Sequence, residues 1–338
     1  ASARKVSDGI SVNDGHDSTS TGAVFMKRFK RILCYIGTDS NEAALSRAVS
    51  LAIRNEASLT IMDVIKPIPK GIVMVGDATD SEELQNIMVN DHEHALLARL
   101  AEYADTAVPI ELVVATGDPA TEIIRQVILA DIDLVIKNAD GLSAPGGAFG
   151  SVARSLLRMC PCPVWLLKPE IHGQFDRVLA AVDLDADDDI HQQLNRNILE
   201  LALSIAGAEQ AQLHLVAAWG LWMEGPLRKR MGDETIDQMV ELQQVKVRRA
   251  LDELLPAGSS GNNRIQIHLH RGDPSEVIRS VADTIEADLM VMGTVCRTGV
   301  SGALVGSTAD SIFSELSCSM LAIKPSGFVS PVQVAARV

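Results

Sequence analysis

A glycine-rich segment from Gly293 to Thr308 has the composition of a phosphate-binding loop. Glycines let a backbone approach a pyrophosphate closely, because no Cβ stands in the way. If a helix begins after Gly306, its first N–H groups and its dipole favour a bound anion, and Ser307 and Thr308 add hydroxyl donors. The chain has neither a Gly-x-x-x-x-Gly-Lys-Ser/Thr run nor a strand-bound Gly-x-Gly-x-x-Gly run. The segment therefore predicts a phosphate cradle without a catalytic lysine.

An acidic residue ends an apolar run elsewhere in the same half of the chain. In open α/β sheets, ligands lie beyond the carboxyl ends of the strands, where the strand order reverses. Asp183 follows the run Ala180-Ala181-Val182 and is interpreted as an acceptor that orients a ligand. Because no nucleophile is paired with a base in either half, the sequence predicts no catalytic residue and no enzyme.

These candidate residues belong to one copy of an internal repeat. Five segments recur in the same order at a nearly constant offset: 29–33 and 175–179, 117–119 and 272–274, 133–136 and 288–291, 150–151 and 306–307, and 162–169 and 318–325. Such self-similarity fixes the architecture before any single motif does. We expect two domains, at 29–170 and 175–327. They are flanked by a tail at 1–28, which is either disordered or not native to the protein, and by a C-terminal tail at 328–338.

Within each copy, short apolar runs alternate with helical periodicity, which is typical of βαβ units around a mostly parallel sheet. In the first copy we expect five strands, at 32–36, 58–64, 110–115, 133–137 and 164–168. The first helix shows the i, i+3, i+4, i+7 spacing of a buried face at Leu45, Ala48, Val49 and Ala52. The pattern predicts two α/β domains with helices on both faces of each sheet.

The spacing of the second loop resembles the signature of the universal stress protein family: Gly, two residues, Gly, nine residues, then Gly with Ser or Thr. Gly293, Cys296, Gly306 and Ser307 reproduce it, with Cys296 replacing the second glycine. In the first copy, Asn138 replaces the first glycine, and only eight residues separate Gly141 from Gly150-Ser151. The resemblance covers about residues 29 to 327 and is closest to tandem, E-type bacterial members.

The resemblance implies an adenine-nucleotide α-hydrolase-like, Rossmann-like fold with strand order 3-2-1-4-5 and a cytoplasmic stress-response role. Some members bind ATP, with an aspartate at the end of strand one beside the adenosine and a backbone segment after strand two beside the base. Asp183 and Ala217 match these two positions. We therefore expect ATP or a related adenine nucleotide in the second domain, held by residues that also include Gly293, Cys296, Gly306, Ser307 and Thr308. Gly141, Gly150 and Ser151 form the weaker site of the first domain.

Family members also pair through their fifth strands. Residues 164–168 and 320–324 are therefore expected to meet within the chain as a pseudo-dimer, and a homodimer is possible. Two other functions stay open: a protein-interaction module that binds no nucleotide, and a slow ATPase.

Composition excludes several classes of function. A net charge of −14 argues against nucleic-acid binding. No apolar run of about 18 residues is present, so we expect no membrane span. Five cysteines without framework spacing favour a reduced, cytoplasmic setting. Cys160 and Cys162 are interpreted as packing residues, His268 and His270 as an exposed strand edge, and 91–94 as solvated helix surface.

Overall fold

The computed structural model describes residues 28–37, 42–68, 81–103, 106, 108–139, 149–168, 174–186, 188–256, 265–294, 309, 311–312 and 316–334.

The first half alternates strands with helices as the periodicity predicts. Its elements are β1 (Arg31–Tyr35), α1 (Ala43–Asn55), β2 (Ser58–Ile65), α2 (Ser81–Leu100), the 3-10 helix η1 (Ala101–Tyr103), β3 (Ile110–Thr116), α3 (Pro119–Leu129), β4 (Leu134–Asn138), α4 (Ser151–Met159) and β5 (Val164–Leu167). The second half has a similar order, with two helices between its second and third strands: β6 (Arg177–Ala181), α5 (Asp189–Glu209), β7 (Gln212–Trp219), α6 (Glu224–Met231), α7 (Asp233–Leu254), β8 (Ile265–Arg271), α8 (Pro274–Thr284), β9 (Leu289–Gly293) and β10 (Ser319–Ile323).

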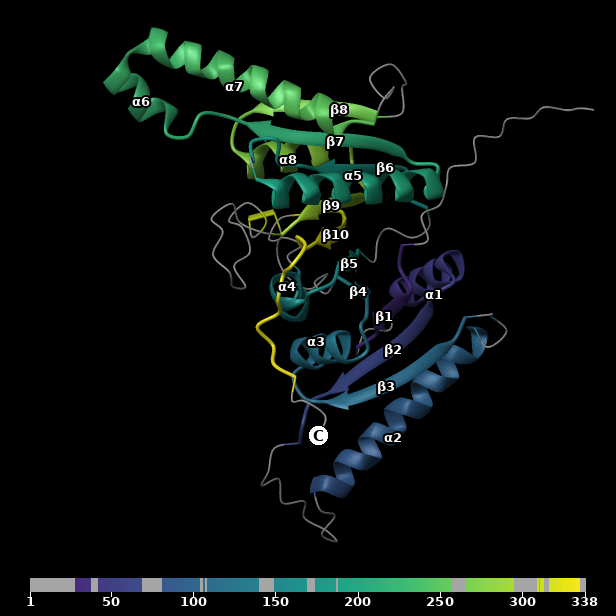
Figure 1. Cartoon of the computed structure of the whole chain (residues 1–338). Helices are drawn as coiled ribbons and strands as arrows, with labels where there is room; N and C mark the ends of the chain where they lie inside the picture. The colour runs from purple at the N-terminus through teal and green to yellow at the C-terminus, as the bar shows by residue number, and fades with distance from the viewer. Residues whose placement is uncertain are drawn as a thin grey trace, which may run out of the picture.

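The described strands form one sheet in the order β3-β2-β1-β4-β5-β10-β9-β6-β7-β8 (Figure 1). Each half thus has the predicted order 3-2-1-4-5. Neighbours within a half are parallel, whereas β5 and β10 pair antiparallel, with Trp165 opposite Leu321. The predicted meeting of the two fifth strands within one chain is confirmed by this pairing.

Helices cover both faces of the sheet, and the apolar cores of the two halves are continuous across the junction. One core lies under α1 and α5 and includes Leu45 and Ala202. The other lies under α3, α4 and α8 and includes Leu156 and Val281. The predicted face of the first helix is confirmed, because Leu45, Ala48, Val49 and Ala52 are all buried. The two halves therefore share both hydrophobic layers as well as one sheet.

The repeated Gly-Asp-Pro motif builds the same turn twice. Gly117 and Gly272 both have φ +156°, which side chains rarely tolerate. The following aspartate caps the next helix: Asp118 accepts a hydrogen bond from the Thr121 N–H at 3.0 Å, and Asp273 does the same for α8. Proline then occupies the first helical turn, where no backbone donor is needed. The repeat therefore records a local folding requirement rather than a ligand site.

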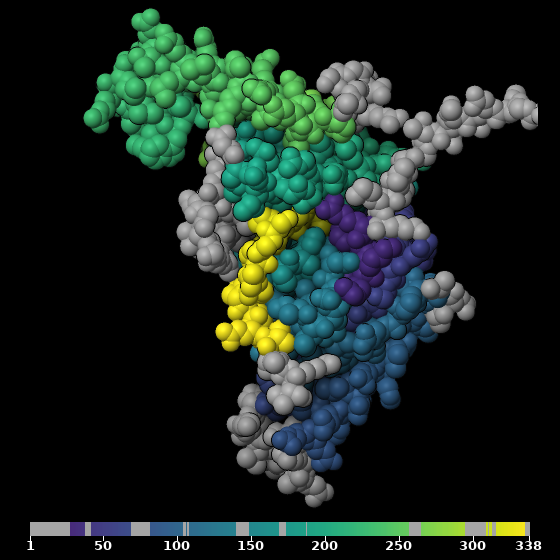
Figure 2. Space-filling view, viewed as in Figure 1, coloured from purple at the N-terminus to yellow at the C-terminus, as the bar shows by residue number. Residues whose placement is uncertain are grey.

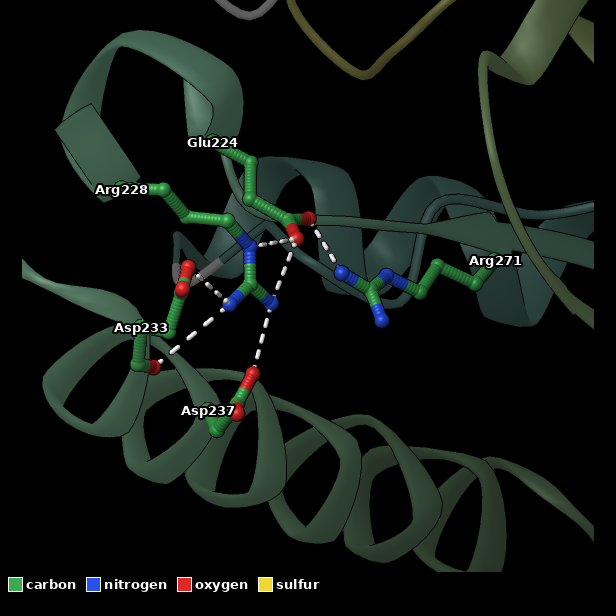
Figure 3. Close-up of polar contacts among 5 residues, drawn as sticks. All are labelled: Glu224, Arg228, Asp233, Asp237 and Arg271. Carbon is green, nitrogen blue, oxygen red and sulfur yellow. Dashed lines mark hydrogen bonds and ion pairs between the residues drawn. The ribbon is translucent and has the colours of Figure 1, made fainter.

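The second half carries a helical hairpin that has no described counterpart in the first. Helices α6 and α7 lie at one end of the molecule (Figure 1), where the surface protrudes as a lobe around α6 (Figure 2). The Arg228 guanidinium donates to Glu224 (3.0 Å) and to Asp237 (2.7 Å), and also reaches Asp233 (Figure 3). Arg271, at the end of β8, contacts the other Glu224 oxygen. One arginine therefore ties α6 to α7, and Glu224 ties α6 to the sheet.

Candidate functional site

Asp183 lies just after β6, at the point where the strand order of the second half reverses. Its N–H donates to Asn195 Oδ1 at 3.0 Å, and Asn195 Nδ2 donates to its carbonyl oxygen at 2.7 Å. The Asp185 N–H donates to Asp183 Oδ1 at 3.1 Å. These bonds hold a half-buried carboxylate at the carboxyl end of the sheet, where it can accept hydrogen bonds from a ligand.

Two small residues lie on the neighbouring strands. Ala217 is buried in β7, and Gly293 ends β9. A Cβ added to Gly293 would come within 2.7 Å of Leu194 Cδ2, so the end of the Leu194 side chain would have to move. The packing of α5 on β9 therefore favours a glycine here independently of any ligand.

Thr294 follows Gly293 and was not singled out from the sequence. It is fully buried, and its N–H donates to the Ile323 carbonyl oxygen at 3.2 Å. Its Oγ1 is buried and has no hydrogen-bond partner within the part of the chain that the structure describes. Leaving a buried hydroxyl unpaired costs about 1–3 kcal/mol, so an acceptor or donor for it is expected from outside the described residues. The signal in the sequence was a hydroxyl residue directly after the strand.

Several predicted site residues lie outside the described residues: Gly141, Cys296, Gly306, Ser307 and Thr308. In the first half, Gly150 is described as the N-cap of α4, with φ −61° and ψ 169°, and Ser151 is exposed at its first turn. This backbone conformation is open to any residue, so Gly150 is not required by the turn itself.

The first half has different side chains at the equivalent positions. The strand registers align Asp63 with Ala217. Asp63 is 3% exposed, and its carboxylate lies 2.9 Å from His92 Nδ1 of α2. The expectation that 91–94 is solvated surface holds only in part for His92, because its side chain is 39% exposed but its ring contacts the buried Asp63 carboxylate. A carboxylate in contact with an imidazole ring replaces a methyl group.

The same registers align Lys137 with Met292 and Asn138 with Gly293. Lys137 is 1% exposed, and its ammonium donates to the Asn138 carbonyl oxygen at 2.5 Å. Asn138 Oδ1 accepts the Ala44 N–H at 3.1 Å, at the start of α1. The sequence contained one indication of this contact that was missed: Lys137 is a charged residue near the end of an apolar strand. Buried polar side chains thus line the switch point of the first half and bond within the protein.

The remaining titratable candidates are structural. Cys160 and Cys162 are buried, which confirms their packing role, and burial raises the pKa of Cys34 and of Cys318 to about 12. His268 is not simply an exposed edge residue, because its Nε2 lies 3.0 Å from Nδ1 of buried His214. Among the described residues, no group of three His, Cys, Asp or Glu is arranged to hold a metal ion.

A search of the described helices found none that is both long and apolar enough to cross a membrane.

Comparison with known proteins gives consistent results over both halves. The family model described as "Universal stress protein family" matches residues 28–168 and again 174–324. A Universal stress protein E homolog of Haemophilus influenzae is 30% identical over 312 residues, covering 88% of this chain and 98% of the relative. Universal stress protein E of Escherichia coli K12 is 32% identical over 237 residues, covering 69% of this chain and 73% of the relative.

Solved structures share the fold over nearly the whole chain. A protein of unknown function from Pseudomonas aeruginosa PAO1 superimposes with a TM-score of 0.63 at 24% identity, covering 89% of this chain and 94% of that one. A universal stress protein from Archaeoglobus fulgidus gives a TM-score of 0.60 at 18% identity, covering 88% and 99%. With two matches of the family model and a relative aligned along nearly its full length, this chain belongs to the universal stress protein family.

Proposed function

We propose that the second half binds one adenine nucleotide, ATP or a close relative, and that the chain acts as a cytoplasmic stress-response binding and signalling protein without catalysing a reaction. The observation that carries this proposal is the contrast between the two halves. At equivalent positions the second half has Ala217 and Asp183, whereas the first has Asp63 and Gly37. We take 29–170 and 175–327 as the two domains.

The residues present in the second half fit a nucleotide. The Asp183 carboxylate is an acceptor for ribose hydroxyls, and its backbone is already fixed by Asn195. Ala217 has only a methyl side chain at the position where the first half has the Asp63 carboxylate, and a base would lie beside it. Thr294, near the start of the glycine-rich segment where phosphates would lie, has a buried Oγ1 with no hydrogen-bond partner among the described residues. When bound, the nucleotide supplies a negatively charged group that this segment would recognise.

The first half does not fit the same ligand. The Asp63–His92 pair occupies the place beside β2 where a base would lie. Lys137 bonds within the protein rather than being held open for a phosphate. We therefore expect one nucleotide per chain. The chain's charge of −14 also leads us to expect no nucleic-acid ligand.

Calorimetric titration with ATP tests this proposal. We expect one site per chain, and Asp183→Asn should weaken binding roughly tenfold, because hydrogen bonds to a charged acceptor contribute about 1.5–3 kcal/mol. Asp188→Asn is the matched control: it makes the same charge change nearby, and asparagine still caps α5.

Three outcomes separate the alternatives. If the unmodified protein binds no ATP, the nucleotide proposal fails and the interaction-module function is favoured. If Asp188→Asn weakens binding as much as Asp183→Asn, the effect is one of net charge, and the assigned role of Asp183 is wrong. Phosphate release during the titration would indicate the slow ATPase instead.

A further inference from the structure

A small cavity lies between α1 and α5, where the two halves meet. Its volume is about 40 Å³. Trp165 of β5 contributes to its lining, together with Leu51 of α1 and Leu201 and Ile205 of α5. Both halves are therefore needed to form it, and it shares no residue with the proposed nucleotide site.

The charged side chains that line this cavity are mostly cationic. They include three arginines, Arg28, Arg47 and Arg54, but a single carboxylate, that of Glu209. One Glu209 oxygen accepts from both Arg47 (2.7 Å) and Arg54 (3.1 Å), and the Glu209 side chain is 4% exposed. Arg28 pairs instead with Glu200, outside the lining, at 3.5 Å. Two guanidinium groups sharing one carboxylate oxygen favour a further anion nearby.

The indole of Trp165 provides a second, independent indication. The residue is 1% exposed, and its Nε1 donor has no hydrogen-bond partner among the described residues. The ring packs against Phe175, with a centroid separation of 6.1 Å, and the Arg47 guanidinium lies 4.4 Å from the Phe175 centroid. An unpaired buried donor costs about 1–3 kcal/mol, so an acceptor that reaches Nε1 after a small shift of the covering side chains would be stabilised by it.

We propose that this cavity binds a small monocarboxylate, of the size of acetate or propionate. One carboxylate oxygen accepts from Trp165 Nε1 and the other faces Arg54, while the short alkyl group lies against Leu51 and Ile205. A cavity of this volume holds about three waters, at roughly 10–15 Å³ each, so three to five non-hydrogen atoms fit. The arginines disfavour a metal cation, and the volume is too small to enclose a nucleotide. The occupied site bridges the two halves.

The indole N–H resonance of Trp165 is a direct probe. The chain has three tryptophans, so a ¹H–¹⁵N spectrum of the full chain contains three indole signals, and the one absent from Trp165→Phe identifies Trp165. Titration with sodium acetate, at fixed pH and with sodium chloride keeping ionic strength constant, should move this signal saturably. A ligand of four non-hydrogen atoms is expected to bind with a Kd of roughly 0.1–10 mM.

Arg54→Gln should raise that Kd roughly threefold to tenfold, because its side chain is partly exposed and its charge is partly screened. Arg249→Gln is the matched control, since this arginine also pairs with a glutamate but lies on α7, away from the cavity. The other two indole signals should stay in place. An unmoved Trp165 signal would overturn the proposal and leave water as the occupant. So would an equal response to chloride alone, or an equal loss in Arg249→Gln.

Discussion

Replacing Leu321 by alanine tests whether the two halves unfold as one unit. Leu321 is fully buried in β10, opposite Trp165 of β5 on one side and Val291 of β9 on the other. The substitution leaves a cavity in the core layer that runs across the junction. Leu59→Ala is the matched control, because Leu59 is equally buried in the same layer but lies in β2, far along the sheet.

The expected shift depends on how many residues unfold together. A buried Leu→Ala change costs about 2–5 kcal/mol, with about 3.5 as a central value. Unfolding entropy is about 2.1 cal/mol/K per residue, which gives about 0.6 kcal/mol/K for a unit of roughly 300 residues and about 0.3 for one half. The melting temperature should therefore fall by about 6 °C if the chain unfolds as one unit, and by about 11 °C if one half unfolds alone.

Differential scanning calorimetry distinguishes the two cases. Because β5 and β10 are paired and the core layers are shared, we expect one transition, lowered by a similar amount in both variants. The reasoning is refuted if two transitions appear, with Leu59→Ala lowering only one of them and Leu321→Ala only the other.

Two further predictions concern single side chains. Burial lowers the pKa of Lys324 to about 8, while its ammonium donates to the Leu157 and Arg158 carbonyl oxygens at the end of α4. Between about pH 8 and pH 10.5, Lys324 is protonated in the unfolded chain but largely neutral in the folded one, so the free energy of unfolding should rise with pH. Urea unfolding of Lys324→Met should show no such rise. A parallel rise in that variant would disprove the assignment. Arg228→Gln should speed amide hydrogen exchange in α6 without changing the melting temperature, because the contacts of Arg228 hold α6 only to its neighbours. Unchanged exchange in residues 224–231 would contradict this.

Local rules explain why so much of the fold was predictable from sequence. Asp133 and Asp288 recur because each carboxylate accepts the first N–H groups of a central strand, those of Lys30 and Arg31 in the first copy. The Gly-Asp-Pro turns recur because their backbone conformation and cap are needed twice. Residues that hydrogen-bond to the backbone in both copies therefore predict the same strands and helices in both, whatever the domains bind.

The polar contacts at the switch points were not predictable in the same way. Lys137 and Asp63 are each the single charged residue of an apolar strand, and nothing in the local sequence predicts which residue their side chains contact. Asp63 meets His92 from α2, 29 positions along the chain, and that contact depends on how the helix is rotated on the sheet. Helix α2 has no strong apolar face, so its rotation on the sheet could not be predicted from the sequence.

The shared sheet gives a physical reason why the two halves diverge. In one continuous sheet each half covers the β5 or β10 edge of the other, so neither depends on a ligand to complete its fold. A half that binds no ligand can then fill its switch point with paired polar groups, as Lys137 and Asn138 do in the first half. In the second half the Asp183 backbone is held by Asn195, and the buried Thr294 hydroxyl has no partner among the described residues. Under the proposed function, the first half stabilises the sheet and the second half binds the nucleotide.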